Sequence, residues 1–178
     1  MLEYAKKYEV KLKELFFDIA FDPFYRFEAY MCYRDVFSLP ENTYNSHHFV
    51  SVHNNDILGM ISYEIKRPEN SVWGLHIIHF GGPNASCPYI FGKDVMTAVK
   101  DIFEKYHFNK LNFSVVIGNP VEKTYDKLVK RYNGRVVGTK EQETRLMDGC
   151  LYDVKEYEIL AGGCFNGKRK LARTQGVQ

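Results

Sequence analysis

The sequence contains few cysteines, and they form no recognisable pattern. Cys32, Cys87, Cys150 and Cys164 include no Cys-x-x-Cys pair, and the 6 histidines include neither a His-Glu-x-x-His segment nor a paired spacing with cysteine. In a chain without a secretory signal, such cysteines are typical of reduced thiols rather than of a disulfide framework. We therefore expect no disulfides and no structural metal site.

The sequence also lacks a long apolar run and an excess of charge of one sign. No stretch is long enough to span a bilayer, and the beginning, MLEYAKKYEV, is charged and has no apolar core of a signal peptide. The 24 Lys and Arg residues nearly balance the 22 Asp and Glu residues, for a formal net charge of +2. We therefore expect a cytoplasmic protein that binds neither membrane nor nucleic acid.

Aromatic residues are abundant, at 15% of the 178 residues, with 13 Tyr and 13 Phe. This excess fits an aromatic core, a ligand groove or an oligomer interface such as that of a homodimer. The length and the 45% hydrophobic content suit one domain with a full core. A basic run, KRK at 168–170, follows two glycines near the end. We expect a single domain over residues 1–160 and a flexible basic tail over residues 161–178.

Residue patterns in the first half predict one element that is either a strand or a helix, then short helices, then a sheet. Residues 6–15 fit either a first strand or the start of a helix. Aromatic residues at helical spacing over residues 18–37 predict one or two short helices, with Pro23 in a first turn. Three β-rich runs separated by polar turns predict an antiparallel meander, over residues 47–52, 57–65 and 72–80.

The second half alternates helices and strands. Residues 93–108 and 120–132 have amphipathic helical patterns, and the apolar run 110–117 between them predicts a buried strand. Two final strands are expected around the Asp148-Gly149 turn. The predicted fold class is α/β (α+β), a mixed and mostly antiparallel central sheet flanked by helices, in the order β-α-β-β-β-α-β-α-β-β.

The segment 117–127, IGNPVEKTYDK, joins the buried strand to the second of these helices. Asn119 can cap that helix, Pro120 can start it, and Tyr125 can pack against the sheet. The same residues also suit the edge of a ligand site at the open end of a strand. The segment alone does not distinguish the two interpretations.

This order of elements, with the segment 117–127, resembles the GNAT family of N-acetyltransferases, most closely the branch that modifies ribosomal-protein termini and similar amines. The resemblance covers roughly residues 48–160. It is carried by a strand that ends at Asn119 and a helix with Tyr125 in YDKLVKRYNGRVVG, by the hairpin ILGMISYEI, and by the ending RVVGT followed by RLMDGCLYDVKEYEI.

The phosphate loop departs from the family pattern. The family has Gln or Arg, then Gly, then Gly or Ala at the start of its central helix, and the matching positions here are Cys87, Ile90 and Gly92. A helix N-terminus offers free N–H groups to a pyrophosphate. Gly92 would allow close approach of the backbone and Lys93 would add a positive charge. The alternative is that GGPNASCP, at the start of the break GGPNASCPYIFG, is only a long turn and that Lys93 is a surface residue.

The resemblance implies an acetyl-CoA-dependent N-acetyltransferase that acts on a primary amine of a small molecule or protein. It implies that the pantetheine arm of coenzyme A pairs with a strand backbone and meets the Asn119 side chain. The strand residues expected to bind it are Ile77, Ile78, His79 and Phe80. The alternative function is a non-catalytic binding protein of the same fold that has lost productive coenzyme A binding.

The resemblance also implies the residues that carry out the transfer. Tyr125 occupies the position of the phenol that serves the leaving thiolate. For the base that accepts the proton of the amine, His76, His79 and Glu64 are candidates. His76 and His79 are expected on opposite faces of one strand because side chains alternate.

Overall fold

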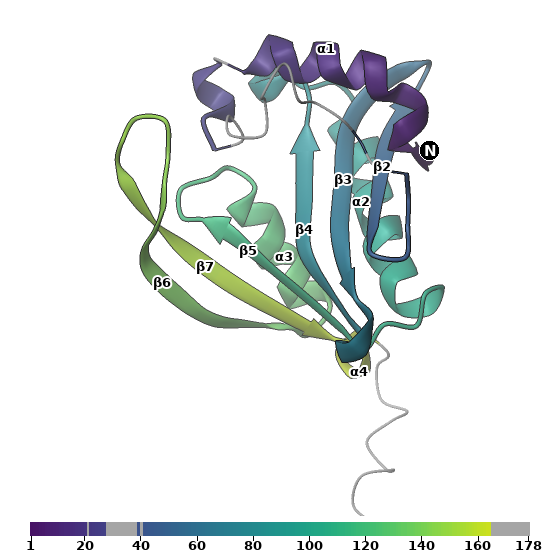
Figure 1. Ribbon diagram of the computed structural model, residues 1–178, viewed down its shortest axis with the longest axis vertical. Coiled ribbons are helices and arrows are strands. Elements are labelled where there is room, and N and C mark those ends of the chain that lie inside the picture. Colours follow the sequence, from purple (N-terminus) through teal and green to yellow (C-terminus); the bar gives the residue numbers. More distant parts are fainter. Residues whose placement is uncertain (21, 28–38, 40, 165–178) are drawn as a thin grey trace, which may run out of the picture.

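One sheet of seven strands forms the centre of the molecule, in the order β1-β2-β3-β4-β5-β7-β6 (Figure 1). The computed structural model describes residues 1–20, 22–27, 39 and 41–164. The strands are β1 (Leu2–Tyr4), β2 (Ser46–His53), β3 (Asp56–Lys66), β4 (Ser71–His79), β5 (Lys110–Val116), β6 (Arg135–Arg145) and β7 (Leu151–Leu160). Only β4 and β5 are parallel neighbours. The predicted mixed, mostly antiparallel sheet is confirmed.

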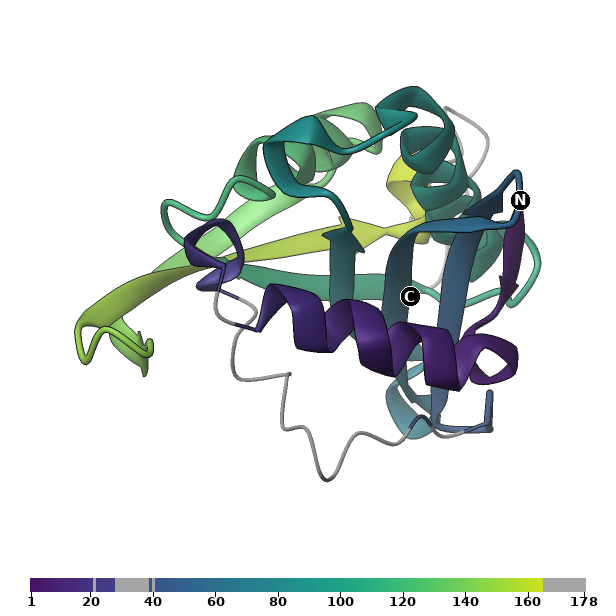
Figure 2. The ribbon, with the colours of Figure 1, turned by 90° about the horizontal axis from the view of Figure 1, so that it is seen from above.

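Helices cover both faces of this sheet (Figure 2). Helix α1 (Glu9–Ile19) lies on one face, and α2 (Pro88–Glu104) and α3 (Glu122–Arg131) lie on the other. Each helix buries an apolar stripe at helical spacing, such as Leu12, Phe16 and Ile19 of α1. The order of strands and α-helices up to β7 is the predicted one. None of the described helices is long and apolar enough to cross a membrane.

The N-terminal elements decide between the two alternatives left by the sequence. The first strand precedes residues 6–15, and a 3-10 helix (Ala5–Tyr8) followed by α1 occupies that stretch. The prediction of one or two short helices over residues 18–37 is confirmed in part, since the described residues of this range include the end of α1 at Ile19 and one short 3-10 helix. Pro23 does start a short 3-10 turn (Pro23–Tyr25), as predicted, while residues 28–38 lie outside the described residues.

Helix α2 begins at Pro88 rather than at the predicted Lys93. Proline suits the first position of a helix, because its φ is already helical and no N–H is lost there. Cys87 before it has a left-handed φ of 51°, and its carbonyl accepts the N–H groups of Ile90 and Phe91 at 3.0 and 3.2 Å. The prediction of a break over 81–92 relied on glycine and proline content and therefore placed the boundary too late.

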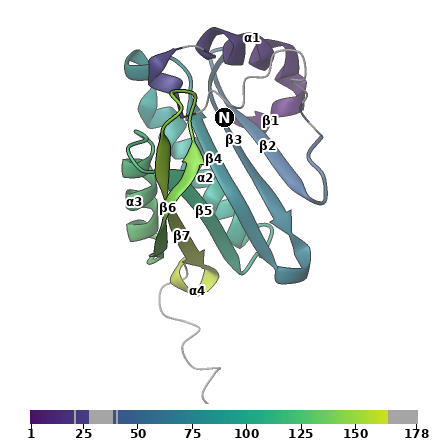
Figure 3. The ribbon, with the colours of Figure 1, turned by 60° about the vertical axis from the view of Figure 1, so that its left-hand side comes forward.

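The remaining strands follow the predictions. β2, β3 and β4 form the meander, and Asn54 and Asn55 turn the first hairpin with positive φ angles of 50° and 67°. The β6–β7 hairpin around Asp148-Gly149 extends beyond the end of β5, with α3 beside its base (Figures 1 and 3). The short helix α4 (Ala161–Cys164) forms the start of the expected tail, and Ala161 is buried. Residues 165–178 lie outside the described part.

Candidate active site

Strands β4 and β5 pair only at their beginnings and then separate (Figure 1). Their parallel register consists of Ser71 with Lys110, Val72 with Leu111 and Trp73 with Asn112. Beyond these pairs, β5 continues against β7 up to Val116, and β4 continues against β3 up to His79. A wedge-shaped gap therefore opens between two adjacent strands of one sheet.

A bulge in β4 lies at the point where the strands separate. Gly74 has a φ of +62°, and an added Cβ there would meet nothing within 4 Å, so the backbone angle rather than space requires glycine. The register with β3 shifts here, between Ser62 and Glu64. A bulge removes a residue from the ladder and redirects its backbone. The carbonyl of Leu75 accepts a hydrogen bond of 2.8 Å from the Tyr125 hydroxyl on α3.

A cavity of about 500 Å³, the first cavity, opens between β4, α2 and α3. Its walls are mostly apolar and include Phe24, Tyr25 and Phe27 from the segment after α1. The charged residues among its lining residues are Lys127 and Arg131, both on α3. The cavity is therefore an apolar groove with positive charge on one wall.

The edge of β4 that faces the gap offers its backbone at Ile77. The N–H of Phe80 donates to a β3 carbonyl at 2.9 Å. Since backbone groups alternate along a strand, those of Ile78 also face β3, while those of Ile77 and His79 face the gap. The His79 carbonyl already accepts the Tyr25 hydroxyl at 2.8 Å. Ile77 is thus the position at which an extended ligand can pair with the strand.

His79 forms part of the wall of the first cavity as a neutral imidazole. Its Nε2 lies 3.1 Å from the Ser86 carbonyl, and because a carbonyl only accepts, we assign the ring proton to Nε2. The ring stacks on Phe91 with the centroids 4.5 Å apart. Burial lowers the pKa of His79, and the hydrogen bond to Ser86 opposes this only in part. Nδ1 therefore carries a lone pair at neutral pH.

A second cavity of about 400 Å³ lies between β4, β5 and the β6–β7 hairpin. It shares Phe27, Asn119 and Val121 with the first cavity. Its lining also includes His76 and Tyr125. Two cavities therefore adjoin at the start of α3, one on each side of the place where β4 and β5 part.

Tyr125 is held in the wall of the second cavity and is not among the residues that line the first. Its side chain is 2% exposed, its ring meets Phe113 edge-on with centroids 4.9 Å apart, and its hydroxyl bonds to Leu75. Along β4, Leu75 and His79 are separated by roughly 13 Å, at about 3.3 Å per residue. The structure therefore brings Tyr125 together with His76 but not with His79.

The N-cap of α3 is Val121 and the helix begins at Glu122, so the predictions that Asn119 caps it and Pro120 starts it are wrong by two residues, and Asn119 instead forms the turn just before it. Its Oδ1 accepts the N–H of Val121 at 3.0 Å, and its carbonyl accepts the N–H of Glu122 at 2.9 Å. Both bonds satisfy donors at the start of α3 that have no partner within the helix. Asn119 therefore both supports the turn that leads into α3 and lines both cavities.

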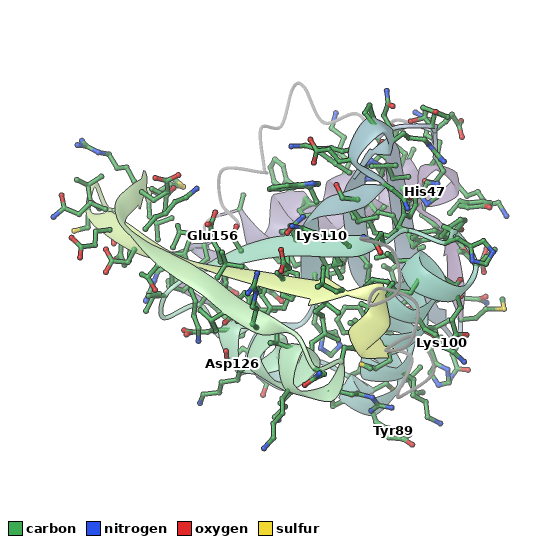
Figure 4. The ribbon with its side chains drawn as sticks, turned by 90° about the horizontal axis from the view of Figure 1, so that it is seen from below. His47, Tyr89, Lys100, Lys110, Asp126 and Glu156 are labelled. Carbon is green, nitrogen blue, oxygen red and sulfur yellow. The ribbon has the colours of Figure 1, made fainter. Side chains whose placement is uncertain are left out.

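The other predicted site residues lie in different places. Glu64 is exposed on β3 and Phe80 packs on the α1 side, and neither is among the residues that line the two cavities. Lys93 is exposed, with its ammonium 4.6 Å from the ring centroid of Tyr89, which projects into solvent (Figure 4). Gly92 lines the first cavity from within α2, beyond the first turn of the helix.

The charged residues of both cavities were not among the predicted site residues. Lys127 and Arg131 share one helix face with Thr124, a spacing that is visible in the sequence. Lys140, Glu143 and Glu156 line the second cavity from β6 and β7. Their placement depends on the pairing of β7 with β5, for which the sequence carries no local signal.

Several solved structures share this fold. A chimera of spermidine N-acetyltransferase SpeG from Vibrio cholerae and hSSAT matches with a TM-score of 0.67 and 16% identity, over 94% of this chain and 98% of that one. A probable acetyltransferase matches with a TM-score of 0.65 and 14% identity, over 90% and 92% of the two chains. A mutant of the Vibrio cholerae SpeG enzyme matches at 0.57 and 20% identity, over 69% of each chain. No protein-family model and no curated protein sequence matches.

Proposed function

We propose that this chain, which has the fold of the GNAT acetyltransferases, transfers an acetyl group from acetyl-CoA to a primary amine of a small molecule or protein. The observation that supports the proposal is the pair of cavities that meet at Phe27, Asn119 and Val121, on the two sides of the separation between β4 and β5. An acyl transferase needs two substrates to meet at one point. Two adjoining cavities of different character provide such a point.

The first cavity fits the acyl donor. Its apolar walls suit the thioester arm, and the backbone of Ile77 can pair with the amides of pantetheine as an added strand would. Lys127 and Arg131 place positive charge beside the groove, as an anionic ligand requires. Acetyl-CoA supplies the activated acetyl group, and this chain supplies the groove and the hydrogen-bonding groups around it.

The second cavity fits an amine. Its carboxylates Glu143 and Glu156 share one ammonium, that of Lys140, at 3.5 and 2.9 Å. Two carboxylates with one cation leave a net negative charge, which favours a protonated amine at this wall. Because these three side chains come from the β6–β7 hairpin, the hairpin forms the acceptor side of the proposed site.

An amine bound as an ammonium first loses one proton, since only the neutral amine can attack. The attack then forms the amide C–N bond and breaks the thioester C–S bond, so a second proton leaves the nitrogen, one proton reaches the sulfur and the other passes to solvent. We assign protonation of the leaving sulfur to the Tyr125 hydroxyl, which lies where the strands separate. His76 is the candidate base, since it lines the second cavity together with Tyr125. His79 is too far along β4, and Glu64 lines neither cavity.

One observation favours the second candidate function, a non-catalytic binding protein. Cys87 and Ile90 stand where the family has Gln or Arg and Gly, and the N–H groups of Ile90 and Phe91 are already bonded to the Cys87 carbonyl. Phe91, however, forms a wall of the first cavity beside His79 rather than closing it. Tyr89 is 73% exposed and occupies no part of the groove.

Calorimetry with coenzyme A separates the two candidates. We expect saturable binding, followed by acetylation of one or more members of a panel of polyamines and peptide N-termini, detected by mass spectrometry. An absence of binding at millimolar coenzyme A would exclude the acetyltransferase. Binding without transfer to any amine, with intact acetyl-CoA recovered, would favour the non-catalytic protein.

A further inference from the structure

We infer that α3, through Lys127 and Arg131, binds the phosphate groups of the acyl donor in place of the loop before α2. The inference rests on the proposed function, because it concerns the donor that the first cavity would hold. It assigns a binding role to two residues outside the positions of the phosphate loop. The ligand class is a phosphate-bearing pantetheine thioester.

The charge of the first cavity is entirely positive and comes from one helix. No acidic side chain is among its lining residues, and the two cations follow each other by one helical turn on α3. With a rise of about 1.5 Å per residue, their backbones are roughly 6 Å apart along the helix axis. Neither Lys127 nor Arg131 forms an ion pair with a described residue, and both are exposed.

The acids of α3 do not neutralise these cations, because they are held on another face of the helix. Glu122 and Asp126 bind the ammonium of Lys155 on β7 at 3.2 and 2.8 Å, and the Tyr157 hydroxyl donates to Asp126 at 2.8 Å. Figure 4 shows Asp126 on the side of α3 near β7. The sequence of α3 mixes both signs of charge, but the fold separates them and turns the positive stripe toward α2.

The start of α2 has few groups left for a phosphate. Pro88 has no N–H, and the N–H groups of Ile90 and Phe91 donate to the Cys87 carbonyl. Lys93 lies over the ring of Tyr89 and does not line the cavity. No side chain on α2 takes the place of the Arg or Gln that this loop lacks, whereas α3 presents two cations across the groove.

The chemistry of the two side chains suits phosphate. A guanidinium can donate two parallel hydrogen bonds to phosphate oxygens, and an ammonium adds a mobile point charge. Thr124, one turn before Lys127, adds a hydroxyl to the same wall. The helix dipole favours cations in the last turn, which accounts for Lys130 and Arg131 alike. It does not account for Lys127 or for the direction in which the stripe faces.

The test is calorimetry of the full chain with coenzyme A and with pantetheine, which lacks all phosphates. We expect Lys127→Ala and Arg131→Ala each to weaken coenzyme A binding about tenfold, because each removes a charge-assisted hydrogen bond. Pantetheine binding should be unchanged. The matched control is Lys130→Ala, on the same helix and likewise exposed, but outside the cavity lining. Arg131→Lys should recover part of the loss.

The outcomes are distinguishable. Wild-type binding of coenzyme A together with unchanged binding by Lys127→Ala and Arg131→Ala would overturn the inference and leave the proposed function standing. Equal losses for coenzyme A and pantetheine, or an equal loss in Lys130→Ala, would also overturn it, since neither is specific to phosphate at this wall. If the wild type binds neither ligand, the proposed function fails first. Thermal unfolding of each variant establishes that the exposed substitutions leave the fold intact.

Discussion

The hydroxyl of Tyr125 on α3 donates a hydrogen bond of 2.8 Å to the carbonyl of Leu75 on β4. Leu75 follows Gly74, whose positive φ forms the bulge that turns this part of β4 out of its ladder with β3. The bond therefore joins a helix to a strand edge at the place where β4 and β5 part. It fixes the phenol in the wall of the second cavity.

Replacement of Tyr125 by Phe should affect stability slightly and turnover strongly. The buried Leu75 carbonyl loses its donor, so we expect the free energy of unfolding to fall by about 1 kcal/mol. Loss of the proton donor for the thiolate should lower kcat roughly a hundredfold. The affinity for coenzyme A should be unchanged. Urea denaturation measures the free energy of unfolding, steady-state kinetics measures kcat, and calorimetry measures the affinity.

Tyr157→Phe is the matched control for this substitution. It removes a tyrosine hydroxyl from the same aromatic cluster, one that donates to Asp126 at 2.8 Å and lines neither cavity. Its stability should fall by a similar amount while kcat stays at the wild-type value. An unchanged kcat in Tyr125→Phe would remove Tyr125 from the mechanism.

Replacement of Glu156 by Gln should weaken binding of the amine and leave binding of the acyl donor unchanged. The change removes one of two carboxylates at the wall of the second cavity. We expect the KM of the amine to rise about tenfold, as for the loss of a charged hydrogen bond, with coenzyme A affinity unchanged. Glu141→Gln on β6 is the control, since Glu141 is exposed and outside both linings. Equal effects of the two variants would show that the second cavity does not hold the amine.

Two glycines isolate the effect of the backbone angle on stability, because there is space for a side chain at both. An added Cβ meets nothing within 4 Å at Gly74 or at Gly92, but only Gly74 has a positive φ. We expect Gly74→Ala to lower the free energy of unfolding by about 1–2 kcal/mol, the cost of a left-handed L-residue. Gly92→Ala, within α2, should raise it by roughly 0.5–1 kcal/mol. Urea denaturation measures both, and a stable Gly74→Ala would show that the bulge does not need glycine.

Acidification should destabilise the protein through three half-buried histidines. Burial is the main cause that lowers the pKa of His47, His48 and His79 below the usual value of 6.5. The unfolded chain then binds more protons than the folded chain as the pH falls below 6.5, so stability is full above that pH and declines below it. The free energy of unfolding, measured by urea denaturation, should be lower at about pH 5.5 than at about pH 7.5.

His48→Leu tests the source of this pH dependence. Both ring nitrogens of His48 are buried and have no hydrogen-bond partner among the described residues. An apolar side chain of similar size should therefore leave stability at neutral pH unchanged or higher, and should reduce the loss on acidification. His53→Leu, on the same strand, is the control. If both variants keep the full wild-type pH dependence, His48 is not one of its sources.

The local elements of this fold could be predicted because their signals are local. The meander β2–β4, the strand β5 and the helix α3 follow from hydrophobic periodicity and turn residues within each segment. The start of α2 could not be placed, since Pro88 fits equally a loop and the first turn of a helix. The first strand was missed because three residues, Leu2–Tyr4, are too short to show a period.

The sequence by itself determined the order of the elements from β2 to β7, the turn at Asn119 and the helical position of Tyr125, because each depends on neighbours a few residues away. Only the tertiary structure decided what these residues face. Tyr125 and Leu75 are 50 residues apart in the chain, and their hydrogen bond requires that α3 pack across the bulge in β4. The positive stripe of α3 likewise faces the first cavity only in the folded protein, in which Lys155 of β7 binds the acids on another face of the helix. Such long-range pairing depends on packing and burial, which no local pattern encodes.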